Sequence, residues 1–219
     1  MSGPDPEVPE LDPLASGLSG LSSPGLSFGW QSSGWRSSPP VIAATWIAVA
    51  GAVALLAWLS FTRNGWVPFL SGVDLGVHEF GHLIFAWAPD LGVALAGSLV
   101  QVAAPAGLAA YFLWRDDRPA VVLMVAWLGM SLNNVSVYIH DATRMVLPLF
   151  GDDGSGAGHD WRFILGELGW LGHTDSIATL VRLASVAAFI ASVALACWFA
   201  REDLGPTVSR RHLQARVAP

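Results

Sequence analysis

The chain has 219 residues, of which 53% are hydrophobic and only 13% are charged, and its formal net charge is −6. This composition is far more apolar than that of a soluble domain, and the negative charge argues against nucleic-acid binding. Cys197 is the only cysteine, which excludes both an internal disulfide and a cysteine-based zinc site within one chain. We therefore expect an all-α membrane protein.

The first 40 residues differ in composition from the rest of the chain. Ser, Gly and Pro occupy 23 of these 40 positions, and such a segment cannot bury enough apolar surface to offset the entropy lost on ordering. No positively charged start precedes an apolar core here, so the segment does not read as a signal peptide. We predict a disordered N-terminal tail over residues 1–40, with a tether or partner-binding arm as the alternative.

From residue 41 onward, apolar runs alternate with short charged or Gly-containing breaks, which indicates a transmembrane domain over residues 41–200. A helix needs about 20 apolar residues to cross the hydrocarbon core of a bilayer. By this criterion we predict a polytopic bundle of about five transmembrane helices, over residues 41–61, 66–88, 91–114, 120–147 and 177–200. Residues 201–219 then form a short cytoplasmic tail.

The placement of the arginines predicts the orientation of this bundle. With five spans, seven arginines fall on the side of the C-terminus, whereas Arg36, Arg144 and Arg162 fall on the other side. Because cytoplasmic loops carry an excess of basic residues, we expect an external N-terminus and a cytoplasmic C-terminus. The expected location is a prokaryotic plasma membrane.

The predicted second span carries the sequence His78-Glu79-Phe80-Gly81-His82, an H-E-x-x-H motif. Residues four apart share one face of a helix, so both imidazoles can bind one Zn²⁺. Glu79 then lies beside the metal, where its carboxylate can act as a general base. Gly81 permits the close approach of a neighbouring helix. The alternative, that these residues are ordinary polar packing, must explain a costly glutamate within an apolar span.

A zinc site that activates water needs a third protein ligand. The predicted fourth span carries a polar stripe, and polar groups within a span usually face the interior of the bundle. This stripe consists of Ser131, Asn134, Tyr138 and Asp141. The candidates for the third ligand are, in order, Asp141, then His159 or Asp160, and then His140. The alternative for Asp141 is that it caps or ends the helix at the membrane interface.

Two further polar residues could support the motif. Asp74 precedes His78 by four residues, and we expect its carboxylate either to accept the second ring N–H of His78 or to be a polar residue near a helix start. Gln101, in the predicted third span, is expected either to bind a substrate backbone or to contact another helix.

The H-E-x-x-H motif within a transmembrane helix resembles that of the site-2 protease family of intramembrane zinc metalloproteases. The second motif of that family, Asn-x-x-Pro-x-x-x-Leu-Asp-Gly, is similar in its Asn-to-Asp spacing to residues 133–142, where Ser136, His140 and Ala142 replace the Pro, Leu and Gly. The resemblance covers residues 66–147. It implies that His78, His82 and Asp141 bind zinc, that Glu79 is the general base and that Asn133 holds the substrate strand.

We therefore expect a zinc metalloprotease that hydrolyses a peptide bond in or near the bilayer, with a membrane protein or peptide as substrate and no nucleic-acid partner. The alternative is a non-catalytic membrane protein, such as a metal-binding protein, a transporter or a degenerate protease homologue. A transporter is expected to carry ionisable groups along several spans, often in inverted repeats, whereas here they concentrate on two spans and no repeat is visible. A degenerate homologue would be expected to lack Glu79, which is present.

Overall fold

The computed structural model describes residues 38–147 and 158–205, which fall within one compact unit and whose regular structure is entirely helical. The all-α prediction is confirmed for these residues. Most of the two predicted tails lies outside the described residues. Only residues 38–40 of the N-terminal tail and residues 201–205 of the C-terminal tail are described. The elements are α1 (Pro39–Thr62), α2 (Leu70–Ile84), α3 (Asp90–Trp114), α4 (Arg118–Asp141), α5 (Asp160–Glu167), a 3-10 turn η2 (Leu171–His173) and α6 (Thr174–Leu204).

Local sequence accounts for several helix ends. A proline lies in the first turn of both α1 and α4, where its missing N–H costs no hydrogen bond. The carboxylate of Asp117 caps α4 by accepting a hydrogen bond from the Ala120 N–H at 3.2 Å. After α1, Asn64 and Gly65 adopt positive φ values of 49° and 78°, which turns the chain toward α2.

Four of these helices are long and apolar enough to cross a membrane, namely α1, α3, α4, and α6 with its preceding turn η2. Their outer faces keep large apolar residues exposed; more than half of the surface of Ile47, Leu99, Ile190 and Val193 is accessible. Such apolar surface is costly in water and suits contact with lipid tails. Together these features indicate a membrane protein.

The predicted span over residues 66–88 is not confirmed. Helix α2 has 15 residues, so it is about 22 Å long, shorter than a hydrocarbon core of about 30 Å. Pro68 cannot donate a backbone hydrogen bond and Phe69 has a φ of 67°, so the helix begins only at Leu70. At its other end α2 stops at Ile84, before Pro89.

The predicted fourth span is also shorter than expected, because α4 ends at Asp141 rather than at residue 147. The two carboxylate oxygens of Asp141 accept hydrogen bonds from the backbone N–H groups of Val146 (3.0 Å) and Leu147 (3.1 Å). These bonds hold the chain in a turn, in which Met145 has a φ of 55°, instead of a further helical turn. Asp141 therefore ends its helix, as the alternative for this residue anticipated.

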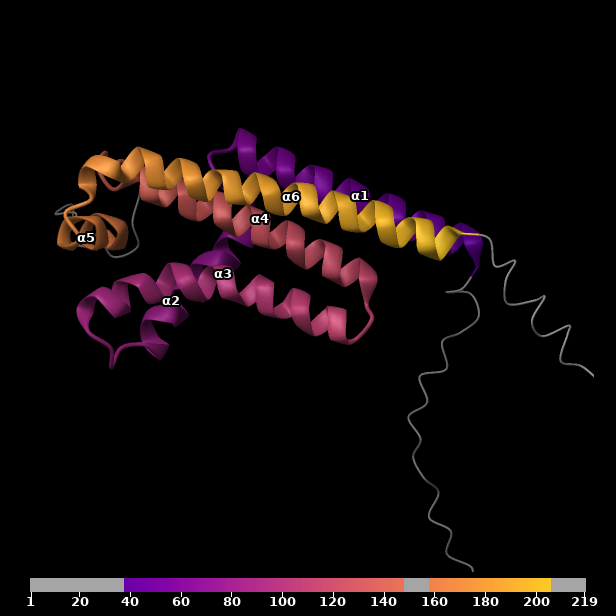
Figure 1. The fold of residues 1–219 in the computed structure, drawn as a ribbon, viewed down its shortest axis with the longest axis horizontal. Helices are drawn as coiled ribbons and strands as arrows, with labels where there is room; N and C mark the ends of the chain where they lie inside the picture. The colour runs from indigo at the N-terminus through magenta and orange to yellow at the C-terminus, as the bar shows by residue number, and fades with distance from the viewer. Residues whose placement is uncertain (1–37, 148–157, 206–219) are drawn as a thin grey trace, which may run out of the picture. The chain divides into compact units, whose positions relative to one another are not determined.

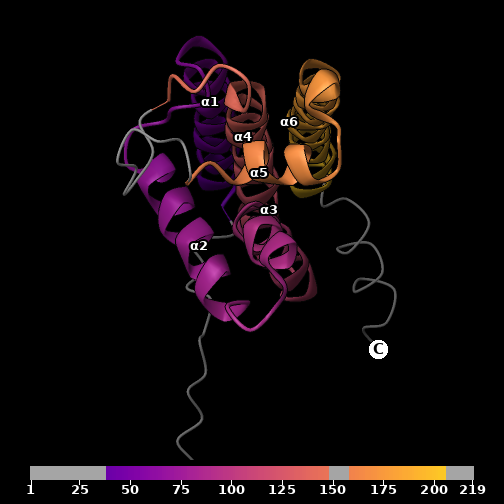
Figure 2. The ribbon, with the colours of Figure 1, turned by 90° about the vertical axis from the view of Figure 1, so that its left-hand side faces the viewer.

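Helix α4 lies at the centre of the described residues and packs against α1, α3 and α6, while α2 packs on α3 (Figures 1 and 2). Small residues bring α4 and α6 together: a Cβ on Gly129 would lie 2.9 Å from the Phe189 ring. Ser185 donates a hydrogen bond from α6 to the Gly129 carbonyl at 2.6 Å. Helix α5 packs on α3 and, less extensively, on α4.

Candidate metal centre

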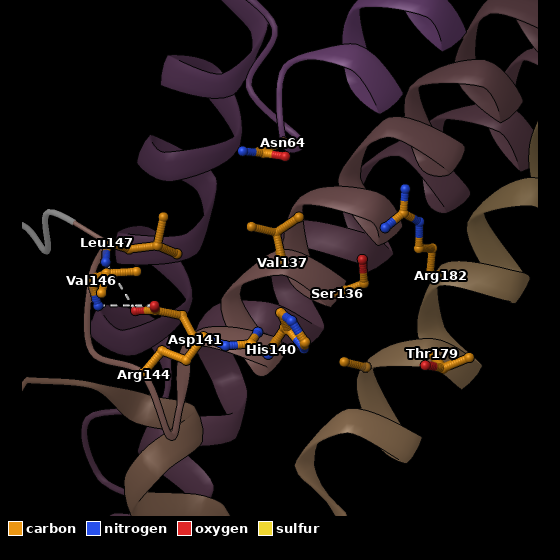
Figure 3. Close-up of a pocket in the computed structure, with 11 residues that line it drawn as sticks. Asn64, Ser136, Val137, His140, Asp141, Arg144, Val146, Leu147, Thr179 and Arg182 are labelled. Atoms are coloured by element: carbon orange, nitrogen blue, oxygen red, sulfur yellow. Dashed lines mark hydrogen bonds between the residues drawn. The ribbon is translucent and has the colours of Figure 1, made fainter.

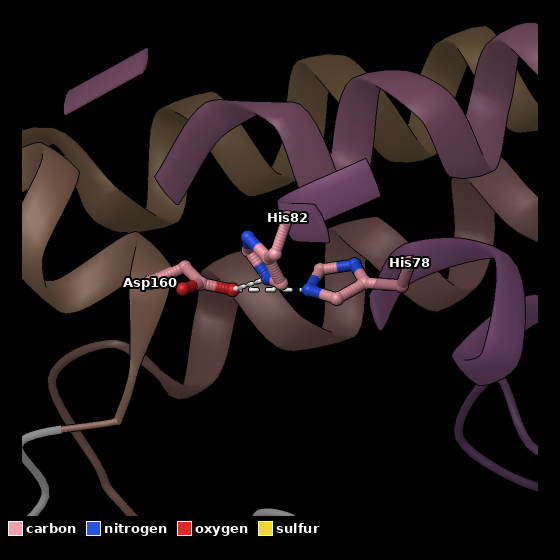
Figure 4. Close-up of side chains that lie close together, drawn as sticks. All are labelled: His78, His82 and Asp160. Atoms are coloured by element: carbon pink, nitrogen blue, oxygen red, sulfur yellow. Dashed lines mark hydrogen bonds and ion pairs between the residues drawn. The ribbon is translucent and has the colours of Figure 1, made fainter. Parts of the chain in front are cut away.

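The two motif histidines lie one turn apart on α2, with their rings 4.8 Å apart between centroids. Both Nε2 atoms point at one carboxylate oxygen, Oδ2 of Asp160, at 3.0 Å for His78 and 3.3 Å for His82 (Figure 4). Asp160 is the first residue of α5. Among the described residues, these three side chains form the group of His, Cys, Asp and Glu that is close enough to hold one metal ion.

The histidines can face inward because α2 and α3 cross at two glycines. A Cβ on Gly81 would lie 2.6 Å from the Ala96 carbonyl oxygen, so the predicted close approach at Gly81 is confirmed. A Cβ on Gly97 of α3 would lie 2.5 Å from Nε2 of His78 and 2.6 Å from Nε2 of His82. Gly97 was not singled out in the sequence, although its neighbours Ala96 and Ser98 mark a run of small residues typical of helix crossings. Its missing side chain leaves the space directly beside both Nε2 atoms free.

Hydrogen bonds to the opposite ring nitrogens fix the tautomers of both histidines. Nδ1 of His82 lies 2.8 Å from the carbonyl oxygen of Val93, which can only accept, so this Nδ1 carries the proton. Nδ1 of His78 lies 3.1 Å from Oε1 of Gln101 and donates to it. In the neutral rings both Nε2 atoms therefore carry lone pairs that point toward Asp160.

A buried hydrogen-bond network sets the orientation of Gln101. Its Nε2 donates to Oδ2 of Asp74 at 3.4 Å and to Oδ1 of Asn134 at 3.0 Å, which leaves Oε1 to face His78. Asp74 also accepts hydrogen bonds from Trp127 Nε1 at 2.7 Å and from Ser131 Oγ at 2.9 Å. The predicted direct bond between Asp74 and His78 is thus corrected: Gln101 lies between them and joins Asp74 to the histidine. Gln101, on α3, thus forms hydrogen bonds with residues of both α2 and α4, as the helix-contact alternative for this residue expects.

The inward-facing atoms fit a zinc ion. With both rings neutral, two imidazole lone pairs and a carboxylate oxygen are all hydrogen-bond acceptors, and they repel one another unless a metal cation or a proton on one Nε2 lies among them. Two ligands of one tetrahedral zinc, with bonds of about 2.0–2.1 Å, lie about 3.3 Å apart. The separations of 3.0 and 3.3 Å from the two Nε2 atoms to Asp160 are close to this value. Two imidazoles and one carboxylate also match the ligand set of catalytic zinc sites, which keep a fourth position open.

Contacts with α4 hold Asp160 in place. Its backbone N–H donates to the hydroxyl of Tyr138 at 3.0 Å, and that hydroxyl donates in turn to Oδ2 of Asp160 at 3.3 Å. His159 stacks on the Tyr138 ring with centroids 4.5 Å apart, and its Nδ1 accepts the Arg162 N–H at 3.3 Å, which caps α5. Burial lowers the pKa of His159, so its ring is neutral near pH 7. Its Nε2 lies 3.5 Å from Oδ2 of Asp141.

Of the four candidates for the third ligand, the structure places one beside the histidine pair. Asp160, ranked behind Asp141, is the residue beside the histidine pair, whereas Asp141 caps the turn after α4 and faces His159. The imidazole of His140 points to another side of α4, where its Nδ1 lies 2.9 Å from Oδ1 of Asp175. His159 caps α5 through its Nδ1. Asp141 is the last residue of α4, and both its carboxylate oxygens are engaged by backbone N–H groups of the turn that follows.

Asn133 also lies elsewhere than expected. Its Nδ2 donates to the carbonyl and to the hydroxyl of Ser60, at 2.9 and 3.0 Å, and its side chain is buried against α1. Asn134, one residue on and therefore rotated by about 100° around the helix, faces the metal centre instead. Asn134 is thus the asparagine on the side of the histidine pair, where its Oδ1 accepts a hydrogen bond from Gln101.

A cavity of about 550 Å³ opens onto the centre between α2 and α4. His78, Asp160 and Glu79 all line it, and Glu79 is exposed there. The remaining wall is mixed: the polar side includes Gln101, Asn134 and Tyr138, and the apolar side includes Trp66, Leu75, Val137 and Leu147.

No protein-family model, curated protein or solved structure matches this chain, so the assignment of the site depends on its geometry.

Proposed function

We propose that this protein is a membrane-embedded zinc metalloprotease, with His78, His82 and Asp160 as the metal ligands. The observation that carries the proposal is that both Nε2 atoms and the Asp160 carboxylate converge at 3.0 and 3.3 Å, an arrangement that a bound divalent cation would stabilise. The position of Glu79, which follows a ligand directly and lines the same cavity, supports hydrolysis rather than a structural metal site.

Zinc bound there would act as a Lewis acid, which polarises the carbonyl of the scissile peptide bond and lowers the pKa of a water molecule. Glu79 takes a proton from the attacking water and delivers it to the departing amine. Because its Oδ1 is engaged by Gln101, Asn134 offers an Nδ2–H to the backbone of the substrate, and Gln101 holds His78 in the tautomer that presents Nε2. The backbone groups of a helix are bonded to one another, so a helical substrate must unwind locally before its peptide bond can be attacked.

The proposed membrane arrangement is a polytopic bundle of four spans, in which α2 enters the bilayer without crossing it. The start of α4 and the end of α6 lie at the same end of the bundle, since Arg118 Nη1 and Asp203 Oδ1 are 2.7 Å apart. The first half of α1 lies there too, because Trp46 Nε1 donates a hydrogen bond to Asp203. Both termini then face the same side. Outside the spans, this side carries seven arginines and the other carries Arg63, Arg144 and Arg162, so both termini are assigned to the cytoplasm.

The decisive experiment compares the wild-type protein with Glu79→Gln in proteoliposomes that contain a tagged single-span substrate. Glu79→Gln retains stoichiometric zinc and lowers the cleavage rate by a factor of about 10² or more, the usual contribution of a general base. The matched control is Glu167→Gln, an exposed glutamate of α5 that does not line the cavity, and it leaves cleavage unchanged. Full activity of Glu79→Gln would refute the assigned base. Stoichiometric zinc without cleavage of any peptide by the wild type would favour a metal-binding protein instead.

A further inference from the structure

Arg182 marks the level of the membrane interface on α6. Residues 183–200 contain no charge, and Arg201 follows them. These 18 positions extend for about 27 Å along a helix, close to the thickness of the hydrocarbon core. The two arginines therefore lie at opposite headgroup layers, although α6 itself continues for a further eight residues before Arg182, from Thr174 onward.

A second cavity, of about 390 Å³, lies beside Arg182 between the end of α4 and the start of α6. Arg144 and Arg182 contribute two guanidinium groups to its lining, and Asn64 and Thr179 add polar atoms (Figure 3). In Figure 3 the guanidinium of Arg182 points from α6 toward the side of the cavity where Asn64 lies. The cavity thus combines a headgroup-level position with two cations.

Neither guanidinium has a side-chain hydrogen bond or an ion pair with another described residue; Arg182 lies 5.7 Å above the ring of Phe61. The carboxylate of Asp141 also lines the cavity, but both its oxygens already accept backbone N–H groups. Asp175, the acid nearest to His140, is engaged by that imidazole at 2.9 Å. Within residues 38–147 and 158–205, therefore, no acidic group neutralises these two cations, which can bind an anion.

We propose that this cavity binds the phosphate group of an anionic phospholipid, with Arg182 as its main contact and Arg144 as the second. A lipid is favoured over a free anion because apolar side chains continue along α6 from this level toward the membrane centre. Leu183, Val186 and Ile190 lie at successive helical turns and are exposed, so they can contact an acyl chain. The site is independent of the proposed hydrolysis, although it shares Asn64, Val137 and Leu147 with the cavity of the metal centre.

The test measures binding of phosphatidylglycerol, with phosphatidylcholine as the neutral comparison, to the purified full chain in detergent by native mass spectrometry. Phosphatidylglycerol binds preferentially, and Arg182→Gln weakens its binding about fivefold, the factor expected for one cation near an anionic lipid. Arg144→Gln shifts it in the same direction. Arg201→Gln, at the opposite end of the same uncharged run, leaves this affinity unchanged. Circular dichroism and thermal unfolding of every variant show that the fold is retained.

Three results would overturn the proposal. The first is equal binding of the two lipids by the wild type. The second is an equal loss of phosphatidylglycerol binding in Arg182→Gln and Arg201→Gln, which would indicate a general charge effect. The third is full displacement of the lipid by millimolar inorganic phosphate, which would show that the site accepts a free anion and not a lipid.

Discussion

His78 and Asp160 lie 82 positions apart in the sequence, yet Nε2 of His78 and Oδ2 of Asp160 are 3.0 Å apart. The contact joins a helix that packs on α3 to a short helix that follows α4. Because the Nδ1–H of His78 is committed to Gln101, the facing atoms are a lone pair and a carboxylate oxygen. The expected effects of substitutions on zinc binding follow from the positions of His78, His82 and Asp160.

We expect Asp160→Ala to lose zinc, as His78→Ala does, because each removes one of three ligands. Asp141→Ala is expected to keep most of its zinc, since Asp141 caps the turn after α4. The measurement is the zinc-to-protein ratio after purification, with His140→Ala as the control because His140 pairs with Asp175 away from the site. Zinc retained by Asp160→Ala and lost by Asp141→Ala would restore the original ranking of the ligands.

Gly97→Ala is expected to abolish zinc binding while the helices remain folded. Its Cβ would lie 2.5–2.6 Å from both Nε2 atoms, so at least one imidazole must move. Gly107→Ala on the same helix is the matched control, because a Cβ at Gly107 meets nothing within 4 Å. That control is expected to be neutral or slightly stabilising, since Ala is a better helix former than Gly. Circular dichroism and zinc content separate the two effects, and normal zinc content in Gly97→Ala would contradict the geometry.

We expect Gln101→Met to lower zinc affinity by a factor of about 10–100, the usual effect of removing a partner that orients a metal ligand. The variant keeps the volume of the side chain but leaves Nδ1 of His78 without its acceptor. Competition with a chromogenic chelator measures the affinity. Ser192→Ala, which removes a buried hydrogen bond to the Val122 carbonyl, controls for general destabilisation and leaves zinc affinity unchanged. If both variants lost affinity equally, the role of Gln101 would be merely structural.

Neighbouring asparagines on α4 are expected to behave differently. Asn133→Ala removes two buried hydrogen bonds to Ser60, and its free energy of unfolding should fall by about 1–3 kcal/mol. Asn134→Ala changes a residue that lines the substrate cavity, so it should raise KM for peptide cleavage with a smaller effect on stability. Thermal unfolding and cleavage kinetics of both variants test this assignment. The reverse pattern would support the sequence motif over the structure.

The helices with continuous apolar runs could be predicted from the sequence. The expected spans over residues 41–61 and 91–114 differ from α1 and α3 by at most two residues at either end, because charged residues and prolines bound them. Helix α2 was predicted too long, since Trp66, Phe69 and Trp87 are apolar but lie outside any helix. Hydropathy reports how apolar a segment is, whereas the helix ends depend on Pro68 and on the positive φ of Phe69.

The histidine pair could be predicted because it depends only on the period of one helix. The third side chain could only be named as one of four candidates, with Asp160 behind Asp141, because the position of Asp160 depends on contacts between distant elements. The Tyr138 hydroxyl holds its backbone, and Trp161 bonds Ser98 of α3 at 3.0 Å. Likewise, whether Asn133 or Asn134 faces the centre depends on how α4 is rotated against α1, α3 and α6, which no single-helix pattern specifies.

Because Asp160 follows four helices, a ribosome makes both imidazoles long before it makes the carboxylate that completes their site. At typical synthesis rates of about 5–20 residues per second, the interval is about 4–16 s. During that time the nascent chain holds two of the three side chains of the group, His78 and His82, without the third. The complete group can therefore form only after α1 to α4 and the start of α5 have been synthesised.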